Sequence, residues 1–404
     1  MANSIDSTFF LTSMQQVQAW VERHHYKGYE AFDGLNSFLR PLTFGTLLGE
    51  QLLQHVGRQS PINLRPLMGI KPQESTKGRG YMAWGHLLRH AASGDATHLA
   101  KAELCLDWLD HHKSKLYAKY SWGNSFDYAS RSGRIPRDEP TIVWSSLIGQ
   151  AYLEAYEQTK NDRWLQIADS VCSGIVDLPR EETSSGTCLS YVFYCQNSVH
   201  NANMLGAAVL ARTAKHTGNP VYLKLARSAM EYSCRRQLPD GAWYYGENPH
   251  YHWIDNFHTG YNLDSLKRYI VYSGDETWRE HLTRGFQYFK AHFIEADGCP
   301  RYYHNRRQPI DIQGAAQVID TLTLFSDEDP ASLELAATVA RWTIMHMQDP
   351  DGHFYYRRYP LITAKVPLIH WGQATMFKAL AHLSSRLEKA ARSSKPDGRQ
   401  LPPR

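Results

Sequence analysis

The chain of 404 residues lacks several features that would assign it quickly to a class. It has no run of basic residues and a net charge of only +4, which argues against nucleic acid as a partner. No apolar stretch reaches about 18 residues, so no membrane span is expected. The first residues, MANSIDSTFF, lack the basic region and apolar core of a signal peptide, so a cytoplasmic protein is expected.

Cysteine is also scarce. The six cysteines are scattered along the chain, without a CxxC pair and without the spacing of a metal site. This pattern predicts free, buried thiols in a reducing compartment. No residue pattern demands a cofactor, and we expect neither a cofactor nor a bound metal.

The chain does contain a repeat of six glycines. Their separations are 64, 57, 54, 54 and 58 residues, and each lies in an apolar stretch that reads as a helix: Gly85, Gly149, Gly206, Gly260, Gly314 and Gly372. A glycine inside a helix costs about 1 kcal/mol relative to alanine. Six glycines at equivalent positions of successive helices indicate a repeated unit in which helix backbones approach closely.

A second, amphipathic helix is predicted between successive glycines. These helices begin near Gly94, Asn161, Gly218, Gly274 and Asp329, and the stretch from Leu39 predicts a sixth. Each pairs with a glycine helix to form a hairpin, and closing six hairpins into a ring buries every glycine helix. The predicted fold is therefore all-α, an (α/α)6 toroid, with short β-hairpins after Asp-Gly turns at one rim.

The repeat also predicts the domain organisation. It is continuous, so residues 1–385 should form a single toroid domain. The stretch from Ser4 to His24 predicts one extra helix that closes the ring or covers a mouth. Residues 386–404 are polar and proline-rich, which predicts a disordered tail.

The glycine helices should run parallel, so their N-termini should meet at one mouth of the ring. The residues there are polar or aromatic rather than aliphatic: Trp144, His200, Asn201, Asn203, Asp255, His258, Tyr261, Asp311, Gln313, His370, Trp371 and Gln373. A single His or Asp at a helix start is more often a cap or a core residue. Convergence from several hairpins instead favours a pocket for a sugar, and helix N-termini favour an acidic one.

The long loop from Tyr117 to Pro140 should lie at the same mouth because it precedes the second glycine helix. Loops of this length are often functional. Trp122, Asp127 and Arg131 are candidates in it, and Arg131 or Arg134 could pair with a substrate carboxylate. A surface loop with its own ion pairs is the alternative.

The segment Trp253-Ile254-Asp255, together with the hairpin repeat, resembles the six-hairpin glycosidases, and is nearest the unsaturated-uronyl hydrolase type. The resemblance implies hydrolysis of an acidic, uronate-containing glycan, with Trp253 in the site and Asp255 as general acid/base. Asp127 or Asp311 would supply the second carboxylate. The whole chain is also similar to proteins encoded in bacterial exopolysaccharide gene clusters.

Other functions fit the same residues. A polysaccharide lyase or sugar epimerase would use His200, His258 and Tyr261 with the neighbouring asparagines. A non-catalytic glycan-binding protein of exopolysaccharide biosynthesis is a further alternative. The segment from Gln237 to Trp243 resembles the QW-type motif of terpene cyclases, but Asp-rich motifs are missing, so we interpret it as a clamp between helices. Three histidines, His200, His258 and His370, could meet as zinc ligands, but their spacing does not demand it.

Overall fold

The computed structural model describes residues 7–130 and 133–393, and its long helices form two concentric layers around one axis. The inner helices pack side by side and the last one closes on the first: α3 (Thr76–Ser93), α5 (Ile142–Thr159), α7 (His200–Thr217), α9 (Asn256–Ser273), α11 (Ile312–Phe325) and α13 (Thr375–Ser393). The outer helices pack behind them: α4 (Ala96–His111), α6 (Asp162–Val176), α8 (Pro220–Cys234), α10 (Arg279–Phe293), α12 (Ala331–Met347) and α1 (Ser7–Arg23). The predicted (α/α)6 toroid is confirmed.

The glycines of the inner helices lie where neighbouring helices touch. A Cβ on Gly85 would fall 2.7 Å from the ring of Phe377 and 3.1 Å from the Cα of Lys378 on α13. At Gly372 the nearest atom would be 3.3 Å away, so the fit there is looser. Close backbone approach therefore explains Gly85 well, whereas it is a weaker reason for Gly372.

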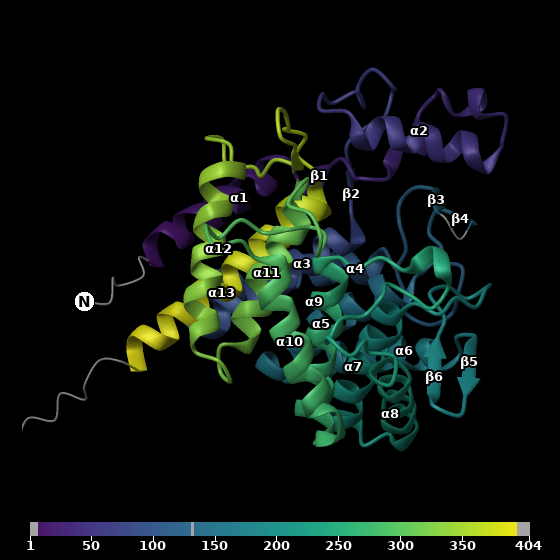
Figure 1. The fold of residues 1–404 in the computed structure, drawn as a ribbon, viewed down its shortest axis with the longest axis vertical. Coiled ribbons are helices and arrows are strands. Elements are labelled where there is room, and N and C mark those ends of the chain that lie inside the picture. Colours follow the sequence, from purple (N-terminus) through teal and green to yellow (C-terminus); the bar gives the residue numbers. More distant parts are fainter. Residues whose placement is uncertain (1–6, 131–132, 394–404) are drawn as a thin grey trace, which may run out of the picture.

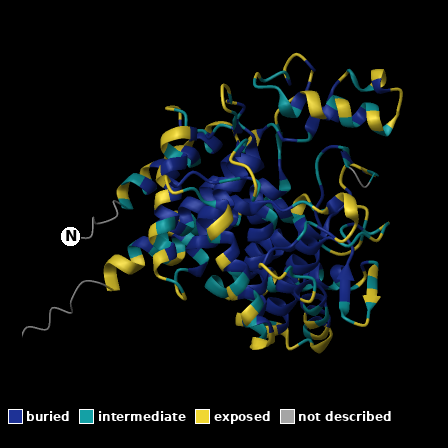
Figure 2. Cartoon of the chain, in the orientation of Figure 1, coloured by how far each residue is buried: buried dark blue, intermediate teal, exposed yellow. Residues whose placement is uncertain are grey.

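The sixth outer position is filled by a different helix from the one expected. Helix α1 buries Phe10, Met14 and Val17 and packs against α13, so the N-terminal helix closes the ring. The prediction of an outer helix from Leu39 was wrong, because α2 (Leu47–Gln59) stands apart from both layers (Figure 1). Figure 2 shows that the ring interior is buried while α2 carries exposed residues.

In the described part of the chain, strands are short and form four small antiparallel sheets. These are β1 (Lys27–Gly28) with β2 (Gln73–Glu74), β3 (Tyr128–Ser130) with β4 (Gly133–Ile135), β5 (Arg180–Thr183) with β6 (Gly186–Leu189), and β7 (Ile310–Asp311) with β8 (Arg357–Arg358) and β9 (Thr363–Ala364). The Asp-Gly turns form, with positive φ at Gly241, Gly298 and Gly352. Isolated bridges close the turns at Gly298 and Gly352, and a short hairpin of the predicted kind, β8 with β9, follows the last of these turns.

The turns also fasten neighbouring hairpins to one another. Gln237 donates from Nε2 to the carbonyl of Gly241 (2.9 Å) and to a carbonyl of α10 (3.0 Å). Gln348 donates in the same way to Gly352 (3.0 Å) and to the carbonyl of Ser13 on α1 (3.2 Å). The QW-like segment is thus a clamp, and its repetition at α1 marks that helix as the sixth outer helix.

Helix α13 continues to Ser393, beyond the domain boundary predicted at residue 385, and residues 394–404 lie outside the described chain. All six cysteines are free thiols, and five of them are buried. Across residues 7–130 and 133–393, no helix is both long enough and apolar enough for a bilayer span.

Candidate functional site

The N-termini of the six inner helices open into one cavity of about 1020 Å³. The sixth is preceded by a π-helical turn, η5 (Ile369–Ala374). Each helix contributes at least one side chain two or three positions after its N-cap, and among these are Lys77, Trp144, Asn201, His258, Gln313 and His370. The parallel inner helices therefore deliver polar and aromatic groups to one mouth, as the sequence predicts.

Nine of the residues predicted from the sequence line this cavity. They are Trp144, Asn201, Trp253, Asp255, His258, Tyr261, Gln313, His370 and Trp371. Arg131 lies outside the described residues.

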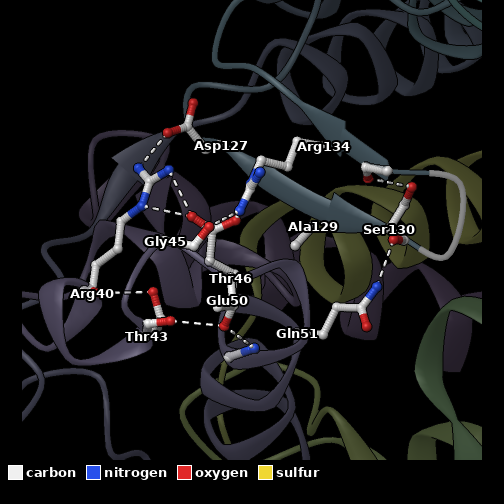
Figure 3. Close-up of polar contacts among 12 residues, drawn as sticks. Arg40, Thr43, Gly45, Thr46, Glu50, Gln51, Asp127, Ala129, Ser130 and Arg134 are labelled. Carbon is white, nitrogen blue, oxygen red and sulfur yellow. Dashed lines mark hydrogen bonds and ion pairs between the residues drawn. The ribbon is translucent and has the colours of Figure 1, made fainter.

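Helix α2 and the β3–β4 hairpin both line the cavity, and polar contacts join them to each other (Figure 3). We call this pair of elements the roof of the cavity. Glu50, which is 3% exposed, accepts hydrogen bonds from Arg40 (3.1 Å) and Arg134 (2.5 Å). Gln51 donates to the carbonyl of Ser130 at 2.7 Å. These bonds tie α2 to the hairpin, so the polar side of α2 faces the cavity: Gln51, Gln54, His55, Arg58 and Gln59.

Asp255 holds His258 in a defined orientation. Its Oδ1 accepts from the backbone N–H of His258 (3.0 Å), which makes it the N-cap of α9. Its Oδ2 accepts from the indole N–H of Trp253 (3.0 Å) and pairs with Nδ1 of His258 (2.7 Å). A carboxylate on Nδ1 favours the tautomer with the proton there, and this leaves Nε2 available as a base. Asp255 is thus both the cap and the positioning partner of a histidine.

A second histidine–carboxylate pair comes from segments far apart in the sequence. Nδ1 of His370 lies 2.5 Å from Oε2 of Glu30, which precedes η1 (Asp33–Asn36). Burial lowers the pKa of His370, and the nearby charge of Lys77 lowers it further, although Glu30 opposes this. Nε2 of His370 is buried without a hydrogen-bond partner in the described chain. Such atoms are uncommon, so a water or a ligand group is expected there.

Lys77 is a buried cation without a carboxylate partner. It is 4% exposed and forms no ion pair within residues 7–130 and 133–393. Its Nζ lies 4.6 Å from the ring centre of Trp144, 5.6 Å from that of Tyr261 and 5.7 Å from that of Tyr81. Burial lowers the pKa of Lys77 to about 7. Such a group can bind an anion or exchange a proton near neutral pH.

Tyr261 belongs to a chain of hydrogen bonds at the same level. Its hydroxyl lies 2.7 Å from that of Tyr81 and accepts from Nε2 of Gln313 (3.2 Å). Burial raises the pKa of Tyr261, so it remains a phenol and acts better as a donor than as a base. Two amide oxygens nearby, Oδ1 of Asn201 and Oε1 of Gln313, are buried without a partner in the described chain.

Two candidates from α7 are bonded to structure outside the cavity. His200 reaches Glu247 with Nε2 (2.8 Å) and Ser233 with Nδ1 (3.2 Å). Asn203 accepts from the backbone of Leu189 (2.9 Å) and donates to α8. Neither residue lines the cavity. Both fasten α7 to its surroundings, so zinc ligation by the three predicted histidines has no support from this geometry.

Four further candidates also lie away from the cavity wall: Trp122, Asp127, Asp311 and Gln373. Trp122 is fully buried and donates to the carbonyl of Leu109, and Gln373 bonds the backbone of Phe354. Asp127 pairs with Arg40 at the rim.

Asp311 caps α11 and organises its neighbours. It pairs with Nε of Arg357 (2.5 Å) and accepts from the indole of Trp371 (2.9 Å) and the backbone of Gln313 (3.0 Å). Its carboxylate has no free face toward the cavity, so it positions Arg357 and Trp371.

Sequence reasoning missed Lys77, Glu30, Arg58 and Arg357. Lys77 could have been found, because it has the same offset from its helix start as Asn201, and only the first glycine helix was left without a candidate. The other three come from irregular segments, from α2 and from β8. No periodicity links those segments to the mouth.

The sequence matches no protein-family model, and a comparison with curated proteins finds no relative. Solved structures of similar fold exist at low identity. A polysaccharide lyase is 11% identical over 97% of this chain and 99% of its own, with a TM-score of 0.62. Cellobiose 2-epimerase from Bacillus thermoamylovorans is 10% identical over 77% of this chain and 87% of its own, with a TM-score of 0.59. A family 76 α-mannanase from Bacteroides thetaiotaomicron is 11% identical over 79% and 88%, with a TM-score of 0.61. The chain shares the (α/α)6 fold of these enzymes.

Proposed function

We propose that the protein is a carbohydrate-active enzyme that transfers a proton at a sugar carbon next to a carboxylate or carbonyl group. The substrate would be an acidic sugar or oligosaccharide, and the reaction an elimination or an epimerisation. The observation that carries this proposal is the presence of two carboxylate-backed histidines, His258 and His370, in the wall of one cavity.

In this mechanism each histidine acts through Nε2, because Nδ1 is held by a carboxylate. One histidine removes the proton from the carbon, and the negative charge that develops is stabilised by nearby cations and amide donors. Return of a proton to the opposite face gives an epimer. Departure of the group on the next carbon, with a proton from the second histidine, gives an unsaturated product.

The charges around the cavity favour an anionic substrate. Lys77, Arg58 and Arg357 line it, although Arg357 is already paired with Asp311. The acids Glu30 and Asp255 already pair with histidines. The guanidinium of Arg58 lies 4.4 Å from the ring centre of Phe32 and forms no ion pair in the described chain. The inner-helix N-termini add positive potential at the same mouth. A uronate carboxylate would give Lys77 and Arg58 the anionic partner that they lack in the described chain.

Proteins of similar fold include enzymes named for both outcomes, a cellobiose 2-epimerase and a polysaccharide lyase, and also a D-mannose isomerase.

Hydrolysis is a second candidate, because two carboxylates, Asp255 and Glu30, line the cavity. It is less supported, since Asp255 already accepts three hydrogen bonds. Asp127 and Asp311, the expected second carboxylates, lie away from the wall.

The test is a panel of acidic oligosaccharides and free uronates, followed by ultraviolet absorbance of unsaturated uronate and by proton NMR in deuterated water. A gain in absorbance means elimination, and deuterium at one sugar carbon without cleavage means epimerisation. His258→Gln should lower kcat/KM by roughly 10²–10⁴-fold. The matched control is His200→Gln, a buried histidine away from the cavity, which should stay within a few-fold of wild type.

Reducing ends released without unsaturation or deuterium exchange would favour hydrolysis instead. Binding of acidic glycans without any turnover would favour the non-catalytic alternative, including a role in exopolysaccharide biosynthesis. Equal losses in the His258 and His200 variants would contradict the assignment of His258.

A further inference from the structure

The segment from Phe38 to Ile70, which contains α2, has an unusual surface. Eight large apolar side chains in it are each more than half exposed: Phe38, Leu42, Phe44, Leu48, Leu52, Val56, Ile62 and Leu67. No exposed residue in this segment carries a formal charge; the others are glycine, proline, Thr46 and His55. Figure 2 shows this exposure on the part of the molecule that stands apart from the ring.

Helix α2 is amphipathic, but it exposes its apolar face, whereas an ordinary surface helix exposes its polar face. Leu48, Leu52 and Val56 are four residues apart, so they share one face, and all three are exposed. Gln54 and Arg58, on another face, line the cavity. A surface helix normally turns its apolar face to the core and its polar face to water. Here the polar face is turned toward the cavity, and the apolar face is left without a partner in the described chain.

We propose that this apolar face binds the same face of a second copy of the chain. An aromatic side chain can bury about 150–250 Å², and we take roughly 100 Å² for each of these eight partly exposed side chains, which is about 800 Å² together. The largest apolar patch of a typical monomer is about 300–600 Å². A standard interface buries about 800 Å² on each partner, so the exposed apolar surface of this segment matches in area one side of a two-fold dimer.

The charges of α2 favour a protein partner over a lipid surface. Helices that lie on membranes carry Lys and Arg along the polar face, beside the apolar one. The charged residues of α2 are Glu50, held by Arg40 and Arg134, and Arg58, which faces the cavity. Within α2 itself, no lysine and no fully exposed arginine therefore flanks the apolar side chains. A second copy would also hold α2 in place as the roof of the cavity.

The test is the mass of the protein in solution, measured by sedimentation equilibrium over a wide range of concentrations. We expect a dimer for the wild type and a monomer for the double variant Leu48→Glu, Leu52→Glu. The matched control, Leu104→Glu with Met345→Glu, changes two side chains that are 55% and 69% exposed on α4 and α12, and should stay dimeric. Circular dichroism and melting curves would show that the variants are folded.

A monomeric wild type overturns the proposal, and so does a dimer that survives both α2 substitutions or that the control variant also dissociates. Flotation of the wild type with vesicles of phosphatidylserine and phosphatidylcholine distinguishes the alternative. Monomers that float with these vesicles would assign the face to lipid. None of these outcomes depends on the proposed reaction, so the two proposals fail separately.

Discussion

Replacing Lys77 by methionine should make the protein more stable and also less active. Burial lowers the pKa of Lys77 to about 7 from the ordinary 10.5, and the charge of Glu30 opposes this shift only in part. No carboxylate of the described chain forms an ion pair with Lys77. Between these two pH values the unfolded chain holds a proton on this lysine that the folded protein does not. Folding is therefore opposed below pH 10.5, and the stability of the wild type rises with pH from 7 toward 10.5.

The size of this effect follows from the two pKa values. The cost to folding is about 4 kcal/mol at pH 7 and about 1 kcal/mol at pH 9.5. Methionine is similar in length and uncharged, so it should remove the cost while keeping most contacts with Trp144 and Tyr261. Urea unfolding of both proteins at the two pH values should show the variant more stable, with a gap that narrows at the higher pH.

The matched control is Lys378→Met in α13. Lys378 is also buried, but it pairs with Asp320, which His382 contacts as well. Removing this lysine leaves a buried carboxylate without its main partner and should destabilise the protein by about 3–5 kcal/mol. The reasoning would be refuted if the difference in unfolding free energy between Lys77→Met and the wild type did not change with pH, or if the variant were less stable than the wild type at pH 7. Turnover of acidic substrates should fall in the same variant, because the carboxylate loses its buried cation.

Two further predictions concern the site and the ring. Asp255→Asn should place an amide donor against Nδ1 of His258 and move the ring proton to Nε2, so kcat/KM should fall by roughly 10³–10⁴-fold. The loss of stability should be small, since Asn is an equally good N-cap. The control Asp127→Asn, at the rim, should retain activity within a few-fold in the same assay, and similar losses in both variants would contradict the role of Asp255. Gly85→Ala should destabilise the protein by about 1–2 kcal/mol in urea, because overpacking against Phe377 exceeds the gain in helix propensity. Gly57→Ala, whose Cβ would meet nothing nearer than 4.0 Å, should instead stabilise it, and equal shifts would argue against tight packing at Gly85.

The sequence predicts the ring because its signals are local and repeated. Caps such as Asp95, Asn161 and Asn219 bond the first turns of the outer helices as their residue types require. Hairpin order along the chain then determines which helix ends share a mouth. Residues such as His258 and Gln313 could therefore be placed near the cavity from the pattern alone.

The same reasoning failed where the partner of a segment decides its role. The apolar residues of α1 and of α2 both recur at helical spacing, but only those of α1 are buried. Helical spacing of apolar residues shows that a helix has an apolar face, but it does not show which element, if any, packs against that face. For the same reason His200 and His258 look alike in sequence, although one is fastened to Glu247 and the other faces the cavity.

The sequence by itself thus determined the number of hairpins, their direction and the polar character of one mouth, since these depend on propensity and spacing within short segments. The tertiary structure decided which polar groups work together. Glu30 meets His370 across almost the whole chain, and Lys77 becomes a cation without a carboxylate only when α3, α5 and α9 close around it. Pairing and burial control proton affinity, and both arise only when the ring is complete.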